Sequence, residues 1–346
     1  MPETTKTVVL TGFGGYEKLE VQDLPRKDPG PNEVEVNIQA SGINFAELMC
    51  RQGLYDNAPK LPGVLGLEGA GIISSLGSEV KSLRKGDRVL CLKAFGLWTE
   101  YAIVDADQCF VIPDEMTMEE AAAIPVNYIT AYHMLFDMGS LRKNKSVLIH
   151  MAAGGVGIAA TQLCKTVENV TVYGTASAGK HDIIKEMGVD YPIDYRTKDY
   201  VQEIRAISPK GVDIVLDPLS GDDSNKGFDL LKPLGTIVHF GAANMVTGKT
   251  RSLFSVAATW WKTKNVNPLG LMRQNKCVAG YHLGHLTHEK ELVTSAVLDL
   301  IALYKEGKIK PRIDSVWSFD KIGDAMAQMN ERKNIGKVII KPHKVD

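Results

Sequence analysis

The chain has 346 residues, of which 44% are hydrophobic and 23% charged, the composition of an ordinary globular protein long enough for two domains. Its 40 Lys and Arg residues nearly balance its 41 Asp and Glu residues, and the net charge of −1 argues against nucleic acid as the main partner. No apolar run approaches the roughly 20 residues that cross a bilayer, so a membrane span is excluded.

The first part of the chain is expected to form a small, mostly β domain. Short apolar or alternating runs are separated by Gly and Pro, the pattern of strands joined by turns. The predicted strands are 7–10, 33–40, 69–73, 87–92, 98–104 and 109–112.

A helix is expected to begin shortly after residue 113, where the pattern changes, and to continue over 121–135. Asp114 or Thr117 can cap it, and Glu119 and Glu120 suit its first turn. Pro125 should kink it.

From residue 146, strands and helices alternate, which predicts a parallel, doubly wound sheet. The simplest architecture inserts this α/β domain, residues 126–275, into a β-rich domain made of residues 1–125 and 276–346. The predicted strands are 146–150, 170–174, 212–216, 236–241, 313–319 and 336–341, and the predicted helices are 156–167, 180–187, 226–231 and 292–305.

A glycine-rich turn lies between a predicted strand and a predicted helix and reads HMAAGGVG over residues 150–157. Gly154 permits close approach of a pyrophosphate, and Gly157 permits close packing of helix and strand. The N–H groups at the start of the helix form an anion site. Ala152 replaces the first glycine of G-x-G-x-x-G, but the strand–turn–helix context favours a dinucleotide site over a simple tight turn. The predicted contacts are Ala153, Gly154, Gly155, Val156 and Gly157.

The end of the next strand indicates which dinucleotide binds. An NAD site has an acidic residue there, whereas residues 174–180 contain two hydroxyls, Thr175 and Ser177, and Lys180. A charge-assisted bond from Lys180 to a 2′-phosphate would contribute about 1.5–3 kcal/mol, which favours NADPH. The alternative is that Lys180 only begins a solvated helix.

Motifs spread along the chain allow a comparison with known families. Gly42-Ile-Asn-Phe45, Arg51-x-Gly-x-Tyr55, Gly66-x-Glu-x-x-Gly71, Gly86-Asp-Arg-Val89 and the turn 151–157 resemble the zinc-independent quinone oxidoreductase branch of the medium-chain dehydrogenase/reductase superfamily. Within this branch, five longer stretches resemble the family of synaptic-vesicle membrane protein VAT-1 homologues. They are residues 10–15, 126–132, 166–172, 208–213 and 309–317.

The resemblance implies a GroES-like catalytic domain, an inserted Rossmann domain, NADPH in the cleft and a homodimer. It also implies that no metal binds. Zinc alcohol dehydrogenases of the superfamily have a Cys ligand where this chain has Asn44 and a His ligand where it has Leu67, so only Glu68 remains. The four-cysteine zinc lobe is absent as well.

Three histidines, His282, His285 and His288, have a metal-like spacing. Without Cys or acidic partners nearby, they are interpreted as surface or interface residues.

The resemblance also implies roles for individual residues. Asn44 would face the nicotinamide and donate to a substrate carbonyl that gains charge, unless it is only a turn residue. Tyr55 would be a second donor, although Met49 replaces a family tyrosine beside it. Thr130 would touch the nicotinamide, with Asn127 one helical turn earlier. Further contacts with the cofactor are expected from Tyr195, Phe240, Gly241, Asn334 and Lys337.

These residues predict a zinc-independent, NADPH-dependent oxidoreductase that transfers hydride to a small quinone or activated carbonyl or enone, with slow or selective catalysis. The scattered cysteines, without a C-x-x-C pair, indicate a reducing cytoplasmic setting, and the first residues carry no secretory pattern.

A second hypothesis comes from the segment between Arg251 and Asn265, in which Trp260, Trp261 and other apolar residues recur at helical spacing between basic residues. This segment predicts either a helix that covers the cleft or a surface that contacts an anionic membrane. In the latter case the protein would be a regulatory factor on vesicle or organelle membranes that retains an NADPH-binding fold with little turnover.

Overall fold

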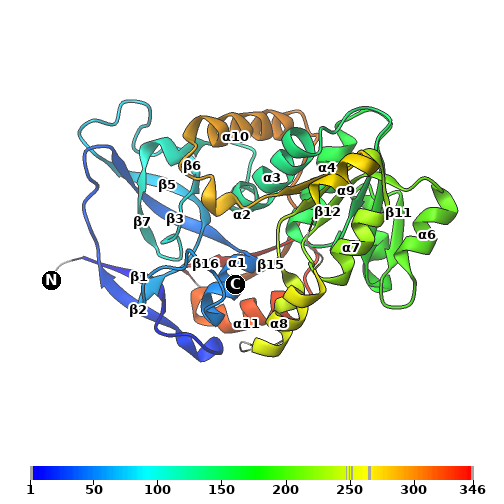
Figure 1. The fold of residues 1–346 in the computed structure, drawn as a ribbon. Helices are drawn as coiled ribbons and strands as arrows, with labels where there is room; N and C mark the ends of the chain where they lie inside the picture. The colour runs from blue at the N-terminus through cyan, green and yellow to red at the C-terminus, as the bar shows by residue number, and fades with distance from the viewer. Residues whose placement is uncertain (1–2, 247, 249, 251, 264–265, 344–346) are drawn as a thin grey trace.

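A β-rich half and an α/β half lie side by side in the folded molecule (Figure 1). This computed structural model describes residues 3–246, 248, 250, 252–263 and 266–343. None of the helices within those ranges has the length and apolar character of a membrane-spanning segment.

The β-rich half contains a seven-stranded sheet and a three-stranded sheet. Its strands are β1 (Thr4–Leu10), β2 (Leu19–Pro25), β3 (Glu33–Ile43), β4 (Gly63–Val64), β5 (Glu68–Leu76), β6 (Arg88–Leu92), β7 (Tyr101–Asp105), β8 (Cys109–Val111), β15 (Ile313–Ser318) and β16 (Lys337–Lys341). The larger sheet has the order β15-β16-β3-β5-β6-β8, with β7 paired to β3, and the smaller has the order β2-β1-β4. Antiparallel pairing of β16 with β3 sets Val338 opposite Ile43. A strand from near the C-terminus therefore lies beside the end of β3.

The α/β half is built on a six-stranded parallel sheet, as the alternating pattern predicts. Its strands are β9 (Ser146–Ile149), β10 (Thr171–Ala176), β11 (Tyr191–Asp194), β12 (Val212–Asp217), β13 (Leu231–His239) and β14 (Cys277–Gly280). The order β11-β10-β9-β12-β13-β14 is that of a doubly wound dinucleotide-binding fold, so the predicted fold class is confirmed. The parallel strands are apolar on both faces because helices cover both, and Val147, Leu148 and Ile149 of β9 are buried.

The helices cover these sheets and link the two halves (Figure 1). In chain order they are α1 (Phe45–Gln52), α2 (Met118–Ala123), α3 (Pro125–Tyr132), α4 (Gly155–Lys165), α5 (His181–Glu186), α6 (Tyr200–Ile207), α7 (Asp222–Asp229), α8 (Leu253–Lys262), α9 (Pro268–Gln274), α10 (Lys290–Lys305) and α11 (Ile322–Asn330).

Local signals predicted some helix ends well. The Thr117 hydroxyl accepts a hydrogen bond from the Glu120 N–H at 3.2 Å and caps α2. Pro125 begins α3, so the helix predicted as kinked is two helices. The parallel sheet continues to β14, and the predicted domain boundary at residue 275 therefore falls before its last strand. Helix α1 was not predicted, although it carries the buried apolar residues Leu48 and Cys50.

Candidate functional site

A cavity of about 1210 Å³ lies between the two halves. On one side it is lined by residues at the end of β3 and in α1, and on the other by the loops after β9, β10, β12 and β13. Ligands bind at this carboxyl edge in doubly wound sheets. All the residues predicted for the site line this cavity, namely Asn44, Tyr55, Asn127, Thr130, Ala153, Gly154, Gly155, Val156, Gly157, Thr175, Ser177, Lys180, Tyr195, Phe240, Gly241, Asn334 and Lys337.

The glycine-rich turn has the geometry of an anion site. Gly154 is the N-cap of α4, with extended backbone angles, and its N–H donates to the Met151 carbonyl at 2.8 Å. A Cβ atom on Gly157 would lie 2.5 Å from that carbonyl oxygen, so only glycine fits there. A Cβ atom on Gly154 would meet the same oxygen at 3.3 Å and nothing else within 4 Å. The first N–H groups of α4 therefore open toward the cavity with room for a phosphate.

The far end of the cavity carries a group of basic residues. The Lys180 ammonium donates to the carbonyls of Arg332 at 2.8 Å and Asn334 at 2.7 Å. Burial lowers the pKa of Lys180, an effect that Asp314 opposes and Arg196 reinforces. Lys180 is thus a half-buried link to the 332–334 loop, with one of its three ammonium protons left for a ligand.

Sequence reasoning missed two further cations, Arg196 and Lys198, which line the cavity beside Tyr195. They directly follow β11, a strand that was not predicted, so their position at the carboxyl edge was hidden. A basic pair after the end of a parallel strand is the signal that could have revealed them.

Asn44 is the N-cap of α1, not simply a turn residue, and its carboxamide is held from two sides. Its backbone N–H donates to the Glu47 carboxylate at 2.8 Å. Its side-chain Nδ2 donates to Glu68 Oε1 at 2.8 Å, and its Oδ1 accepts from Lys337 Nζ at 2.6 Å. Lys337 is also ion-paired with Glu68, whose other oxygen accepts the Val126 N–H at 2.6 Å. One N–H of the carboxamide stays available to a molecule in the cavity.

Glu47 lies fully buried beneath this network and also accepts the Leu67 N–H at 3.2 Å. Burial raises its pKa to about 7, while Lys337 lowers the pKa and Glu68 raises it further. The floor of the site therefore holds one carboxyl group that changes charge near neutral pH.

Asn127 and Thr130 both lie on α3 and are almost fully buried. The Asn127 carboxamide lies against the glycine-rich turn, because a Cβ atom on Gly155 would be 2.3 Å from its Nδ2. Across the cavity, the Tyr55 ring packs on the His282 ring at 5.4 Å. Burial raises the pKa of Tyr55, so its hydroxyl keeps its proton and can donate.

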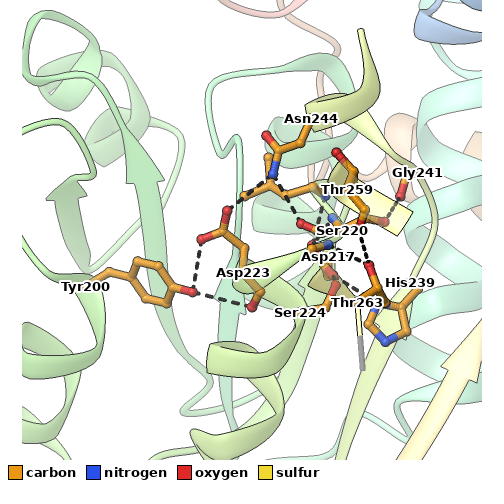
Figure 2. A network of polar contacts seen from close by, with 12 residues as sticks. Tyr200, Asp217, Ser220, Asp223, Ser224, His239, Gly241, Asn244, Thr259 and Thr263 are labelled. Atoms are coloured by element: carbon orange, nitrogen blue, oxygen red, sulfur yellow. Dashed lines mark hydrogen bonds and ion pairs between the residues drawn. The ribbon is translucent and has the colours of Figure 1, made fainter. Parts of the chain in front are cut away.

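A second polar network, also missed from the sequence, fixes the loops after β12 and β13 (Figure 2). Asp217 and His239 end neighbouring strands, and His239 Nδ1 lies 2.9 Å from Asp217 Oδ2, which also accepts from the Ser224 hydroxyl at 2.5 Å. Tyr200 donates to Asp223, in the first turn of α7, at 3.3 Å. His239 lines the cavity, and because Asp217 holds one of its ring nitrogens, the other could bond to a ligand there.

The expectation that no acidic residue lies near the spaced histidines is wrong. His285 Nε2 lies 3.5 Å from Asp56 Oδ2, and the His282 and His285 rings are 4.4 Å apart. His288 lies apart from them, exposed beside Glu289. Asp56 was missed because it is far away in the sequence and joins the histidines only in the fold.

Two family models match the chain. The alcohol dehydrogenase GroES-like domain matches residues 30–114, and the zinc-binding dehydrogenase model matches residues 187–340. Among curated proteins, the synaptic vesicle membrane protein VAT-1 homologs of Rattus norvegicus and Homo sapiens are each 56% identical over 339 residues. The matches cover 97% of this chain and 84% and 86% of those proteins.

Solved structures are similar over nearly the whole chain. The crystal structure of the human synaptic vesicle membrane protein VAT-1 homolog-like protein has a TM-score of 0.87 and 41% identity, covering 99% of this chain and 100% of that one. The Escherichia coli quinone oxidoreductase complexed with NADPH has a TM-score of 0.85 and 30% identity, covering 98% and 100%.

The zinc in the name of one family model has no fitting ligands at the corresponding position here. Leu67 is apolar, and the Lys337 ammonium already pairs with Glu68 beside Asn44. The Sγ atoms of Cys91 and Cys109 are 3.6 Å apart, a single pair where a structural zinc site needs four ligands. The residues at these two positions therefore do not fit a zinc ion.

Proposed function

The chain belongs to the medium-chain dehydrogenase/reductase superfamily, among the VAT-1 homologs, and from this membership we propose that it is a zinc-independent, NADPH-dependent oxidoreductase. Its substrate would be a small quinone, enone or activated carbonyl compound. One observation carries the proposal: the glycine-rich turn at the start of α4 and the fixed Asn44 carboxamide line the same cavity from opposite halves.

Separate groups of residues would bind the cofactor and the hydride acceptor. The N–H groups of Gly155, Val156 and Gly157 would hold the pyrophosphate, and the cations at the far end would hold the 2′-phosphate. NADPH, when bound, supplies the hydride. Asn44 would donate its remaining N–H to the acceptor oxygen as that oxygen gains charge, and Lys337 keeps the carboxamide from rotating. Similarity to the Escherichia coli quinone oxidoreductase, whose structure is a complex with NADPH, supports the choice of cofactor.

We expect purified protein to oxidise NADPH with at least one member of a panel of quinones and enals, and to use NADH much less well. Lys180→Met should lower the preference for NADPH by about 10-fold or more, because a charge-assisted bond contributes about 1.5–3 kcal/mol. The measurement is kcat/KM for both cofactors. Lys185→Met, on the exposed side of α5, is the control and should leave the ratio unchanged. Equal use of NADH and NADPH would contradict the assignment of NADPH as the cofactor. If no acceptor were reduced, the proposed oxidoreductase function would be contradicted, and only contact with a membrane surface would be left as a candidate function.

A second candidate function is contact with an anionic membrane surface, and α8 supports it. Trp261 on this helix is 82% exposed, beside Lys262, which pairs with Asp222 at 2.9 Å. The predicted ends of this segment, Arg251 and Asn265, lie outside the described residues, as does the side chain of Trp260. The names of the relatives also refer to a vesicle membrane.

Co-sedimentation with phosphatidylserine vesicles tests this candidate. Trp260→Ser/Trp261→Ser should remove most binding, because an exposed tryptophan next to basic residues inserts at the interface. Leu298→Ser removes an exposed apolar side chain on α10 and should leave binding unchanged. Equal sedimentation of both variants would exclude α8 as the contact. A homodimer and a cytoplasmic location stay predictions.

A further inference from the structure

Three side chains with metal-binding groups lie close together, and two of them, Asp56 and His282, line the cavity. Asp56 lies in the loop after α1, and His282 and His285 follow β14, the last strand of the parallel sheet. One ligand atom from each lies within 4.8 Å of the other two. Among the residues that the structure describes, no second group of His, Cys, Asp or Glu meets this condition.

We propose that Asp56, His282 and His285 bind one divalent transition-metal ion, for which zinc(II) is the best fit. Two imidazoles and one carboxylate are a donor set that zinc accepts, with a fourth position left for water. His285 Nε2 and Asp56 Oδ2 are 3.5 Å apart. A tetrahedral zinc ion with bonds of about 2.0–2.1 Å holds neighbouring ligand atoms about 3.3–3.4 Å apart, so the pair already has the required separation.

The surroundings of both rings suit metal ligands. His285 Nδ1 lies 3.3 Å from the Asn57 amide, which can hold the ring in place. With a metal on Nε2, rotation of this amide would present its oxygen to the Nδ1 proton, the usual support for a histidine ligand. His282 Nδ1 is buried and has no hydrogen-bond partner among the described residues, while Tyr55 packs on the ring.

This site differs from the zinc position of the superfamily, since it uses neither Asn44, Leu67 nor Glu68. It also joins the two halves, because Asp56 belongs to the β-rich half and the histidines follow the α/β sheet. An ion there would tie together two parts of the chain that line the cavity, the loop of Asp56 and the segment of His282. As a consequence that rests on the proposed function, zinc should slow turnover by restricting exchange of the hydride acceptor.

The test is metal binding by the full chain, purified without a polyhistidine tag and stripped of metal. Titration with cobalt(II) should produce the visible bands of a four-coordinate site, with one equivalent bound, and zinc(II) should displace it. His285→Ala and Asp56→Asn should each abolish these bands and weaken zinc binding by at least about 100-fold, and Asn57→Ala should weaken it by about 10-fold. This readout does not require that the protein turn over any substrate.

His288→Ala is the matched control, because His288 has the same spacing in the sequence but lies outside the group. It should bind cobalt as the unchanged protein does, and thermal midpoints should show that all variants fold. Binding of one equivalent that survives both His285→Ala and Asp56→Asn would overturn the assignment. Failure to bind cobalt or zinc would overturn it too, and would show that Asp56 and His285 form only an ion pair.

Discussion

Lys337→Met is expected to lower the free energy of unfolding by about 3–5 kcal/mol at pH 8, because it leaves a buried carboxylate without its counter-charge. Glu68 is 0% exposed and Lys337 3%, and the ammonium is the cation that pairs with Glu68. The thermal midpoint, measured by scanning calorimetry, should fall by on the order of 10 °C. Lys341→Met is the control on the same strand: Lys341 pairs with Glu119 nearer the surface, and its loss should cost about 0–1 kcal/mol. Equal midpoints for the two variants would contradict the prediction.

Measuring kcat/KM beside stability distinguishes the contribution of Lys337 to stability from its role in positioning Asn44. Adding Glu68→Gln to Lys337→Met removes the unpaired charge and should restore much of the lost stability. It should not restore kcat/KM, because the Asn44 carboxamide still lacks the ammonium that donates to its Oδ1. Recovery of both quantities would mean that Lys337 serves only stability.

The loss of stability in Lys337→Met should be smaller at pH 6 than at pH 8. Burial raises the pKa of Glu47 from 4.5 to about 7, against the effect of Lys337. The stability that protonated Glu47 contributes is therefore complete below about pH 4.5 and is lost as the pH rises through about 7. At pH 6 Glu47 is mostly neutral and needs no counter-charge, whereas at pH 8 it is mostly ionised beside Glu68. A loss that is the same at both pH values would show that Glu47 is not part of this balance.

The features that the sequence predicted well depend on neighbouring residues. The turn from Met151 to Gly157, the cap at Thr117 and the break at Pro125 each depend on contacts within a few positions. The parallel sheet also followed from alternation, although two of its six strands, β11 and β14, were not predicted. Helix α1 could have been found from the same kind of signal, since Asn44 and Glu47 have the N-cap and N3 spacing of a capping pair.

The missed features depend on pairs that only the fold brings together. Lys337 and Asn44 are 293 positions apart, and strand pairing of β16 with β3 is what makes them neighbours. His239 and Asp217 meet because they end adjacent parallel strands. The order of polar residues along the chain could not reveal these contacts, because strand order and register decide them. The same holds for Asp56 beside His285.

Gly154→Asp is expected to weaken NADPH binding by at least about 100-fold, or nearly 3 kcal/mol, without lowering the stability of the ligand-free protein. A Cβ atom at this position meets only one oxygen, at 3.3 Å, and the backbone is extended. Asp is also a good N-cap, slightly better than Gly. Its carboxylate would bond the first N–H groups of α4 and so occupy the place of the pyrophosphate. Fluorescence titration with NADPH and the thermal midpoint of the ligand-free protein measure the two effects.

Gly157→Asp adds the same side chain three residues later, and the contrast locates the anion site. Its Cβ would lie 2.5 Å from the Met151 carbonyl oxygen and 2.7 Å from Ala152 Cα, so this variant should lose both stability and binding. Gly270→Asp on α9 adds the same charge away from the cavity and should change neither. If Gly154→Asp bound NADPH as tightly as the unchanged protein, the pyrophosphate could not lie at the start of α4. The proposed oxidoreductase function would then lose its main support, because the fixed Asn44 carboxamide would have no hydride donor opposite it.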